Sequence, residues 1–519
     1  MFKKSLALLL ILLMLVPFAV SCKKNDAGSG ESNGGDVSES QGNGQSQSGS
    51  NRYDQYDVID AVGDRDYGEY TVTVAHVGHA HFADEISPER ITGDLVSDSL
   101  YKRDRAIEKR LNVKMKTYVA PGSGVYRLGE TVRESVSSGL SPFDIMINPI
   151  YTACSFITEG LYHDMNTLDD IDFDQVYWGK FANDSMEIGG IQYVATGAIA
   201  LNYYRFIFAT LVNDRILGET TGEVPDLIKV VNDGKWTLEY QTALANKYYV
   251  NQGASGKDED DILGFYGSAQ GITNIYCDPY LSACDVSILG KDADGYLTVD
   301  FDLGRASSAV SAVSDLLTAA GSLVSTTTSD NLPDMFGNGN VLMTTLRFME
   351  IGYDVVRNMK DTYTILPMPM LDEEQEDYYS TLHDSASGVA IPITLDEKNL
   401  QMIGAVVEVM ASESYRTVTP AYYENVLKTR YIANPENWEI VDMIMTNAVL
   451  DPITPFTNSL KIDGKTPIFR WRLTCTDAVN SGGNLTVSSY FSDAYLNQLL
   501  LTLNGTNGLN TYFQGINAN

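Results

Sequence analysis

Apolar and polar residues alternate along the chain with two periods, one typical of strands and one typical of amphipathic helices. Between residues 70 and 147 this pattern predicts a strand, a helix, a strand, a helix and a short buried strand, at residues 70–77, 99–111, 113–119, 125–138 and 143–147. The order β-α-β-α-β is typical of a parallel sheet covered by helices. We therefore expect an α/β fold.

A second series of strands and helices follows further along the chain. Asp233-Gly234 ends one helix, and Thr237 is expected to cap the next. A strand, a helix, a strand and another strand are then predicted at residues 341–346, 347–360, 363–366 and 388–393. Thr394 to Glu397 resembles a capping box, which opens a helix with Leu400, Ile403, Val407 and Met410 on one face. From Tyr415 onward the pattern is mostly helical.

The first residues carry the pattern of a secretory signal that ends in a lipidation site. Lys3 and Lys4 precede an apolar run at residues 6–16, and Pro17 ends it. Ala19, Ser21 and Cys22 follow, so small residues stand directly before a cysteine. A signal anchor is the alternative, but a spanning helix needs about 20 apolar residues and this run is shorter. We expect a signal peptide at residues 1–21 and a lipid on Cys22.

Residues 22–51 are expected to form a tether between that lipid and a folded body that begins at residue 52. They are almost entirely polar or glycine, with Val37 as the one large apolar residue from Asn25 to Asn51, and such a segment cannot bury enough surface to fold. The formal net charge of the chain is −32, which makes nucleic acid an improbable partner. The predicted location is extracytoplasmic, at the cell membrane, through the lipid alone.

The cysteines and the short acidic motifs give no metal pattern, and we expect no cofactor. Cys154, Cys277, Cys284 and Cys475 lack the spacing of a zinc site. Cys277 and Cys284 are close enough in sequence to form a disulfide, yet buried free thiols fit equally well. Residues 292–295 resemble the start of a calcium loop but lack its closing glutamate, which favours a hairpin turn.

Four stretches of the sequence, in their order and spacing, carry a resemblance to a known family. The first is Ser-Pro-Phe-Asp-Ile-Met at 141–146 with Glu-Gly-Leu-Tyr-His-Asp at 159–164, and the second is Ile-Gly-Gly-Ile-Gln-Tyr-Val-Ala at 188–195 with Leu-Val-Asn-Asp at 211–214. The third is Phe-Gly-Asn-Gly-Asn-Val-Leu-Met at 336–343 with Ile-Leu-Pro-Met-Pro at 365–369. The fourth is Ser-Gly-Val-Ala-Ile-Pro at 387–392. Together they resemble the family 1 extracellular solute-binding proteins, the sugar-binding receptors of ABC importers.

The resemblance implies a periplasmic-binding-protein-like fold of type II, with two α/β lobes that are joined by hinge strands and close over a ligand. It places the first lobe at residues 52–195, the second at 196–386 and a return to the first at 387–414. A helical region at 415–519 would pack on both lobes. This long tail departs from the family pattern, as does Arg347, which stands where many members have a small residue.

Candidate ligand contacts follow from the rule that ligands bind beyond the carboxyl ends of the strands in open α/β sheets. His79 and His81 follow the first strand, and a metal site there would need a carboxylate from elsewhere, so the pattern favours polar residues at the rim of a cleft. Asn148 and Tyr151 follow the third strand, where they would either bond and stack a sugar or hold a local turn.

Aromatic and charged residues further along the chain complete the set of candidates. Trp178, Tyr204 and Tyr276 would offer flat faces to sugar C–H groups, although any single ring also suits the core. Arg347 begins a predicted helix, where a cation is unfavourable, and Glu350 lies one turn later. Arg347 is therefore expected to bind a carboxylate or hydroxyl of a ligand, or to form a salt bridge.

The predicted function is that of a monomeric lipoprotein receptor that captures a carbohydrate, in particular an oligosaccharide, and delivers it to an ABC permease. A secreted glycan-acting enzyme is the main alternative, but the chain has neither a Gly-x-Ser-x-Gly elbow nor a His-Glu-x-x-His helix. We therefore expect no enzymatic activity. A lipoprotein that senses a ligand without transporting it is a third hypothesis, which sequence alone does not separate from the first.

Overall fold

A computed structural model describes residues 55–219, 222–253, 256–269, 275–325, 331–423, 436–483 and 485–518. All of them belong to one compact unit, residues 52–519. The predicted signal peptide, Cys22 and the tether lie outside the described residues and stay predictions.

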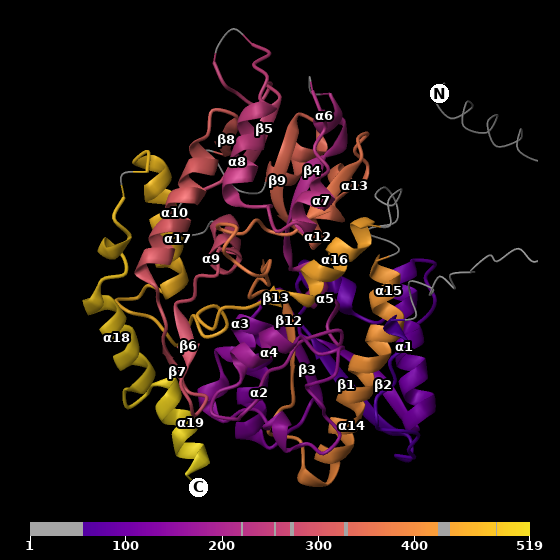
Figure 1. Ribbon diagram of the computed structural model, residues 1–519. Coiled ribbons are helices and arrows are strands. Elements are labelled where there is room, and N and C mark those ends of the chain that lie inside the picture. The colour runs from indigo at the N-terminus through magenta and orange to yellow at the C-terminus, as the bar shows by residue number, and fades with distance from the viewer. Residues whose placement is uncertain are drawn as a thin grey trace, which may run out of the picture. The chain divides into compact units, whose positions relative to one another are not determined.

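The first sheet has four strands in the order β12-β3-β1-β2 (Figure 1). Its strands are β1 (Tyr70–His76), β2 (Val113–Val119), β3 (Ile145–Pro149) and β12 (Ser387–Ala390). β1 is parallel to both β2 and β3, whereas β12 is antiparallel to β3. Helices α1 (Leu95–Leu111) and α2 (Arg127–Ser138) connect the parallel strands. The β-α-β-α-β order predicted from the sequence is therefore confirmed.

The second sheet has five strands in the order β10-β4-β9-β5-β8. Its strands are β4 (Phe208–Asn213), β5 (Leu263–Ser268), β8 (Ser322–Ser325), β9 (Val341–Arg347) and β10 (Tyr363–Leu366). Helices α8 (Leu238–Lys247) and α10 (Leu303–Thr318) contact β5. The Thr237 side chain accepts a hydrogen bond from the Tyr240 amide and so caps α8, as predicted. We call each sheet with its helices a lobe.

Two crossing segments connect the lobes. The first leaves the first lobe after Ala195, which bridges to Val389 in β12, and the second returns through Ser387. A further bridge joins Ile207 to Leu382 next to β4. The predicted α/β fold with two lobes is confirmed, while the residue boundaries predicted for the lobes stay predictions.

The remaining elements are short, except in the C-terminal quarter of the chain. The helices are α3 (Ile150–Cys154), α4 (Lys180–Met186), α5 (Leu201–Arg205), α6 (Asp214–Gly218), α7 (Leu227–Asn232), α9 (Pro279–Ala283), α11 (Leu332–Gly337), α15 (Thr419–Tyr422), α16 (Glu436–Thr446), α17 (Pro467–Asn480), α18 (Asp493–Asn504) and α19 (Leu509–Asn517). The strands are β6 (Leu289–Lys291), β7 (Leu297–Val299), β11 (Ser380–Thr381) and β13 (Ala448–Val449). Within the described ranges, no helix is both long and apolar enough to cross a membrane.

Two predicted helices differ from the observed ones. The single helix expected at residues 347–360 is wrong, because the chain forms α12 (Phe348–Ile351) and α13 (Asp354–Arg357) with a break at Gly352 and Tyr353. The expected cap at Thr394 is also wrong. The Asp396 side chain caps α14 (Glu397–Glu413) by accepting from the Asn399 amide.

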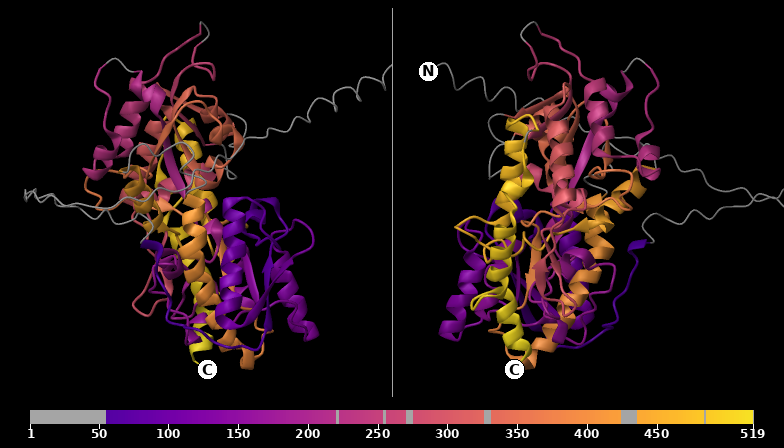
Figure 2. Two further views of the ribbon diagram at one scale, coloured as in Figure 1. Left: turned by 90° about the vertical axis from the view of Figure 1, so that its right-hand side faces the viewer. Right: turned by 60° about the vertical axis from the view of Figure 1, so that its left-hand side comes forward.

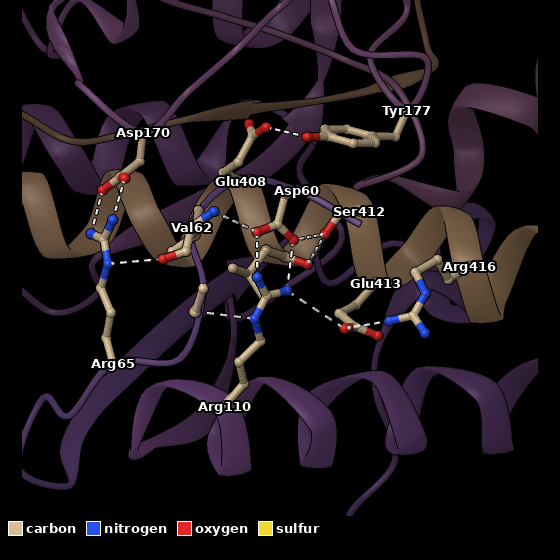
Figure 3. A network of polar contacts seen from close by, with 12 residues as sticks. Asp60, Val62, Arg65, Arg110, Asp170, Tyr177, Glu408, Ser412, Glu413 and Arg416 are labelled. Atoms are coloured by element: carbon tan, nitrogen blue, oxygen red, sulfur yellow. Dashed lines mark hydrogen bonds and ion pairs between the residues drawn. The ribbon is translucent and has the colours of Figure 1, made fainter. Parts of the chain in front are cut away.

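From Met402 onward, helix α14 is buried on all sides instead of on one face. Every residue from Met402 to Glu413 is buried, because α14 packs between the first sheet's helices and the start of the described chain. Figure 3 shows this contact, in which Asp60 accepts two hydrogen bonds from Arg110 of α1 and one from Ser412 of α14. The N-terminal segment is thereby fixed to the first lobe.

The C-terminal helices contact other parts of the described unit, and their predicted assignment as a separate region stays a prediction. Figure 2 shows them in yellow, running along one side of the described unit. Asn510 of α19 pairs with both the amide and the carbonyl of Leu297 in β7, which protects the edge of the β6–β7 hairpin. Cys154, Cys277, Cys284 and Cys475 are buried free thiols, so Cys277 and Cys284 do not form a disulfide.

Candidate functional site

A cavity of about 430 Å³ lies where loops of the two lobes meet. The first lobe contributes the loop after β1 and the start of α1, and the second lobe contributes α12 and α13, which follow β9. The crossing helix α5 and Tyr422 of α15 close the remaining sides. Since both β1 and β9 have parallel neighbours and end at this cavity, it occupies the position where open α/β sheets bind ligands.

His81 forms part of the wall from the first lobe. Shortly after β1 the chain forms a 3₁₀ helix (Ala80–Glu85). His79 caps the start of this helix, because its Nδ1 atom accepts a hydrogen bond from the His81 backbone amide at 3.2 Å. The two rings stack edge to face, 4.9 Å apart. Burial and the nearby charges of His79, Arg347 and Arg205 lower the pKa of His81. The neutral imidazole can therefore both donate and accept a hydrogen bond.

Arg205 of the crossing helix α5 reaches the same cavity. Its Nη1 atom donates to the Asn202 amide oxygen at 2.9 Å, and its Nη2 atom lies 2.8 Å from the Asp84 carboxylate. The side chain of Arg205 is only 11% exposed, whereas that of Asp84 is 66% exposed. The cation is therefore held in place from one side, while its acidic partner faces solvent.

Arg347 and Glu350 form a fixed pair next to the cavity. The Glu350 carboxylate accepts from the Arg347 backbone amide at 2.7 Å, from its guanidinium at 2.5 Å and from the Tyr276 hydroxyl at 2.8 Å. The guanidinium also stacks over the Phe206 ring at 5.2 Å. Of the two roles predicted for Arg347, the salt bridge is therefore present, within one turn of the chain.

Asn148 lies near the end of β3 and Tyr151 lies in α3, and neither residue lines this cavity. Asn148 is fully buried opposite Gly388 of β12, and neither atom of its amide group has a hydrogen-bond partner among the described residues. Tyr151 is half-buried and packs edge to face on Tyr126, with the ring centroids 5.9 Å apart. The structure therefore leaves Asn148 as an unsatisfied polar group and gives Tyr151 a local packing role.

Trp178 and Tyr204 belong to the core and are not among the residues that line the cavity. The Trp178 indole donates to Glu408 at 3.0 Å, and Glu408 also accepts from the Tyr177 hydroxyl (Figure 3). The Tyr204 hydroxyl accepts from Thr419 at 3.2 Å. Both side chains are buried and have protein partners for their polar groups, so the structure places them in the core and not on the wall of this cavity.

Several residues of the cavity wall were absent from the sequence-based set. They are Arg205, Phe348, Tyr353, Arg357, Tyr363 and Tyr422, together with Asp84 and Asp94. Phe348 directly follows the predicted ligand contact Arg347, so the residue that lines the cavity is one position later in the chain. Tyr422 comes from the helical tail, where no sequence pattern indicates a contact with the cleft. Within the described parts of the chain, no group of three or more His, Cys, Asp or Glu is placed to hold a metal ion.

Comparisons with known proteins find similarity in structure and not in sequence. No protein-family model matches the chain. No curated protein matches its sequence either. The GacH receptor of Streptomyces glaucescens, solved unliganded and with acarbose, is 16% identical, and the match covers 83% of this chain and 98% of the receptor with a TM-score of 0.51.

Two further structures give a similar result. A cyclo/maltodextrin-binding protein in complex with maltotetraose is 12% identical, with coverage of 84% of this chain and 97% of that chain and a TM-score of 0.53. An ABC substrate-binding protein from Listeria monocytogenes in complex with cycloalternan is 15% identical, with coverage of 84% and 99% and a TM-score of 0.50. The described chain therefore has the fold of carbohydrate-binding ABC substrate-binding proteins, as the sequence resemblance predicts.

Proposed function

We propose that this protein is an extracytoplasmic receptor that captures a carbohydrate between its two lobes and delivers it to an ABC permease. One observation carries the proposal: the walls of the cavity come from the carboxyl ends of strands in both sheets. A ligand bound there contacts both lobes, so its binding energy favours the arrangement in which the lobes are closed.

The chemistry of the cavity wall suits a carbohydrate. Tyr353 supplies an exposed aromatic ring, while His81, Arg205 and Asp84 supply donors and acceptors. The solved structures with this fold bind acarbose, maltotetraose and cycloalternan. Their ligands support the proposed substrate class.

The proposed route to the membrane is a lipid on Cys22. The preceding residues match a signal peptide, and the composition of the segment after Cys22 suits a tether. Labelled palmitate should be incorporated into the wild-type chain and not into Cys22→Ala. Incorporation into the variant would remove this part of the proposal.

A thermal-shift screen tests the receptor function. The full chain, purified in detergent, should melt at a higher temperature in the presence of its oligosaccharide, because a ligand that binds only the folded state stabilises it by mass action. Mass spectrometry should recover that oligosaccharide unchanged after incubation, whereas cleavage products would point to the enzyme alternative. A panel of mono- and oligosaccharides that never shifts the melting temperature would contradict the receptor.

A further inference from the structure

The β6–β7 hairpin and helix α19 connect the two lobes at a place that is separate from the crossing segments. The hairpin leads directly into α10 of the second lobe, which contacts β5. Helix α19 lies next to the hairpin (Figure 1), because the Asn510 side chain accepts from the Leu297 amide at 3.1 Å and donates to the Leu297 carbonyl at 2.7 Å. We call the β6–β7 hairpin (residues 289–299) and α19 together the strap.

The strap contacts a segment that is fixed to the first lobe. Ala195 pairs with Val389 of β12 through both its amide and its carbonyl, at 3.0 and 2.7 Å, so the residues that lead up to it are held on the first sheet. Tyr193 stands two residues earlier, and its ring packs on the Phe513 ring of α19 with the centroids 5.6 Å apart. Both rings are buried, so this contact excludes water.

Two hydrogen bonds at Gly189 add to the aromatic contact. The Asn517 side chain of α19 donates to the Gly189 carbonyl at 2.9 Å. The Gly189 amide donates to the carbonyl of Gly295, at the turn of the hairpin, at 3.0 Å. Both parts of the strap therefore hold the same turn on the side of the first lobe.

The strap is attached more firmly to the second lobe than to the first. Asn510, Phe513 and Asn517 share one face of α19, since they are three and four residues apart. Asn510 is only 2% exposed, and its side chain bonds to Leu297 and to Asn504. In contrast, α19 is exposed from Gln514 onward. Exposed helix ends with few buried contacts open first, so separation of the lobes would release the end of α19 and leave its start on the hairpin.

We propose that the strap opposes the opening of the lobes and thereby controls how readily a ligand enters and leaves. Lobes that swing apart about the crossing segments must separate Phe513 from Tyr193 and break the hydrogen bonds at Gly189, because these contacts join the two lobes. Opening loses the free energy of these contacts and closure regains it, so the strap favours the closed arrangement. This inference deepens the proposed function, and it rests on that function for its consequence for binding.

Distance measurements on the full chain without ligand test the strap directly. Spin labels on p-acetylphenylalanine at positions 137 and 308 involve no cysteine and report on the two lobes, since Ser137 of α2 and Ser308 of α10 are exposed. In double electron–electron resonance, Phe513→Ala should add a population at longer distances and raise the ratio of open to closed molecules about fivefold or more. Asn517→Ala, which removes the polar end of an exposed side chain, should raise this ratio by a smaller factor.

Ile516→Ala is the matched control, because Ile516 belongs to the same helix and is 37% exposed. It should keep the distance distribution of the wild type. Wild-type distances in both Phe513→Ala and Asn517→Ala, or a shift of the same size in Ile516→Ala, would overturn the inference. If circular dichroism shows that Phe513→Ala does not fold, Asn517→Ala decides the test, because its side chain is exposed and its loss leaves the core intact.

The outcomes separate this inference from the receptor function, because no ligand enters the distance measurement. Longer distances in the strap variants, together with a saccharide panel that never binds, would leave the strap standing and overturn the receptor. Saccharide binding together with unchanged distances would overturn the strap alone.

Discussion

Glu85 illustrates how single buried residues connect the cleft loop to the hinge. Its carboxylate accepts from the Ser387 hydroxyl and from the Asn202 amide, each at 2.7 Å, so one side chain links the loop after β1 to both crossing segments. Burial raises the pKa of Glu85 to about 7. The buried position of Glu85 therefore favours the protonated carboxyl over the carboxylate.

The raised pKa predicts how stability depends on pH. Between the ordinary glutamate pKa and about 7 the folded state binds more protons than the unfolded state, so stability should fall as pH rises through this window. Glu85→Gln keeps an acceptor for Asn202 and a donor for Ser387 without the charge. From pH 5 to pH 7.5 the wild type should lose roughly 1–3 kcal/mol relative to Glu85→Gln in urea unfolding.

Several buried carboxyl groups of the chain titrate in this pH range. Comparing the wild type with Glu85→Gln isolates the contribution of Glu85 to the pH dependence of stability. Asp384 and Glu408 also have pKa values of about 7, and both are unchanged in the variant. Parallel stability profiles of the two proteins over this pH range would show that Glu85 is already ionised in the folded state, contrary to the account.

The sequence predicts residues of the cleft only where a local pattern points to it. His81 follows a recognisable strand, and it lines the cavity. Arg205 and Tyr422 reach the cavity through long-range packing, from a short crossing helix and from the C-terminal region, and no local pattern encodes such contacts. Asn148, Trp178 and Tyr204 follow the same types of pattern but lie elsewhere, because burial depends on the whole fold.

At the level of elements, the β6–β7 hairpin contacts a turn of the first lobe at Gly189. The Gly189 amide donates to Gly295 at 3.0 Å, and its carbonyl accepts from Asn517 of α19 at 2.9 Å. Gly189 has a φ of +59°, and a Cβ there would lie 2.7 Å from the Tyr296 ring. The β6–β7 hairpin and helix α19 therefore both contact this one turn.

Substitutions at this turn separate a steric clash from backbone strain. Gly189→Ala should destabilise the protein by about 2–4 kcal/mol, because it adds overpacking to an unfavourable left-handed backbone. Gly190 also has a positive φ, +81°, but no atom lies within 4 Å of the place that an added Cβ would occupy. Gly190→Ala should therefore cost only about 1 kcal/mol. Equal losses in denaturant unfolding would show that the hairpin does not press on this turn.

The elements also show where periodicity misleads. The residues after β9 have a helical pattern, yet the chain breaks at Gly352 and Tyr353 into two short helices that form the cavity wall. In α14 the predicted apolar residues Ile403, Val407 and Met410 are buried, but the opposite face is buried too, because the N-terminal segment around Asp60 covers it. The hydrophobic periodicity of a segment shows which of its faces prefers to be buried. It does not show which faces other segments of the chain cover.

At the level of the whole molecule, the account depends on both lobes contributing to one cavity. The order of elements and the resemblance predict the two lobes, since each lobe is built from local β-α units. The contribution of the C-terminal region to the cavity could not be predicted, because it brings Tyr422 next to residues more than 200 positions earlier in the chain, such as Arg205. Only the folded arrangement shows that the tail is part of the site.

Amide hydrogen exchange of the full chain, with and without an oligosaccharide that raises its melting temperature, tests this central claim most directly. The account predicts that protection rises together at residues 80–97 of the first lobe and at 347–357 of the second, because one ligand contacts both walls of the cavity. Protection confined to one lobe, or located away from both segments, would contradict it.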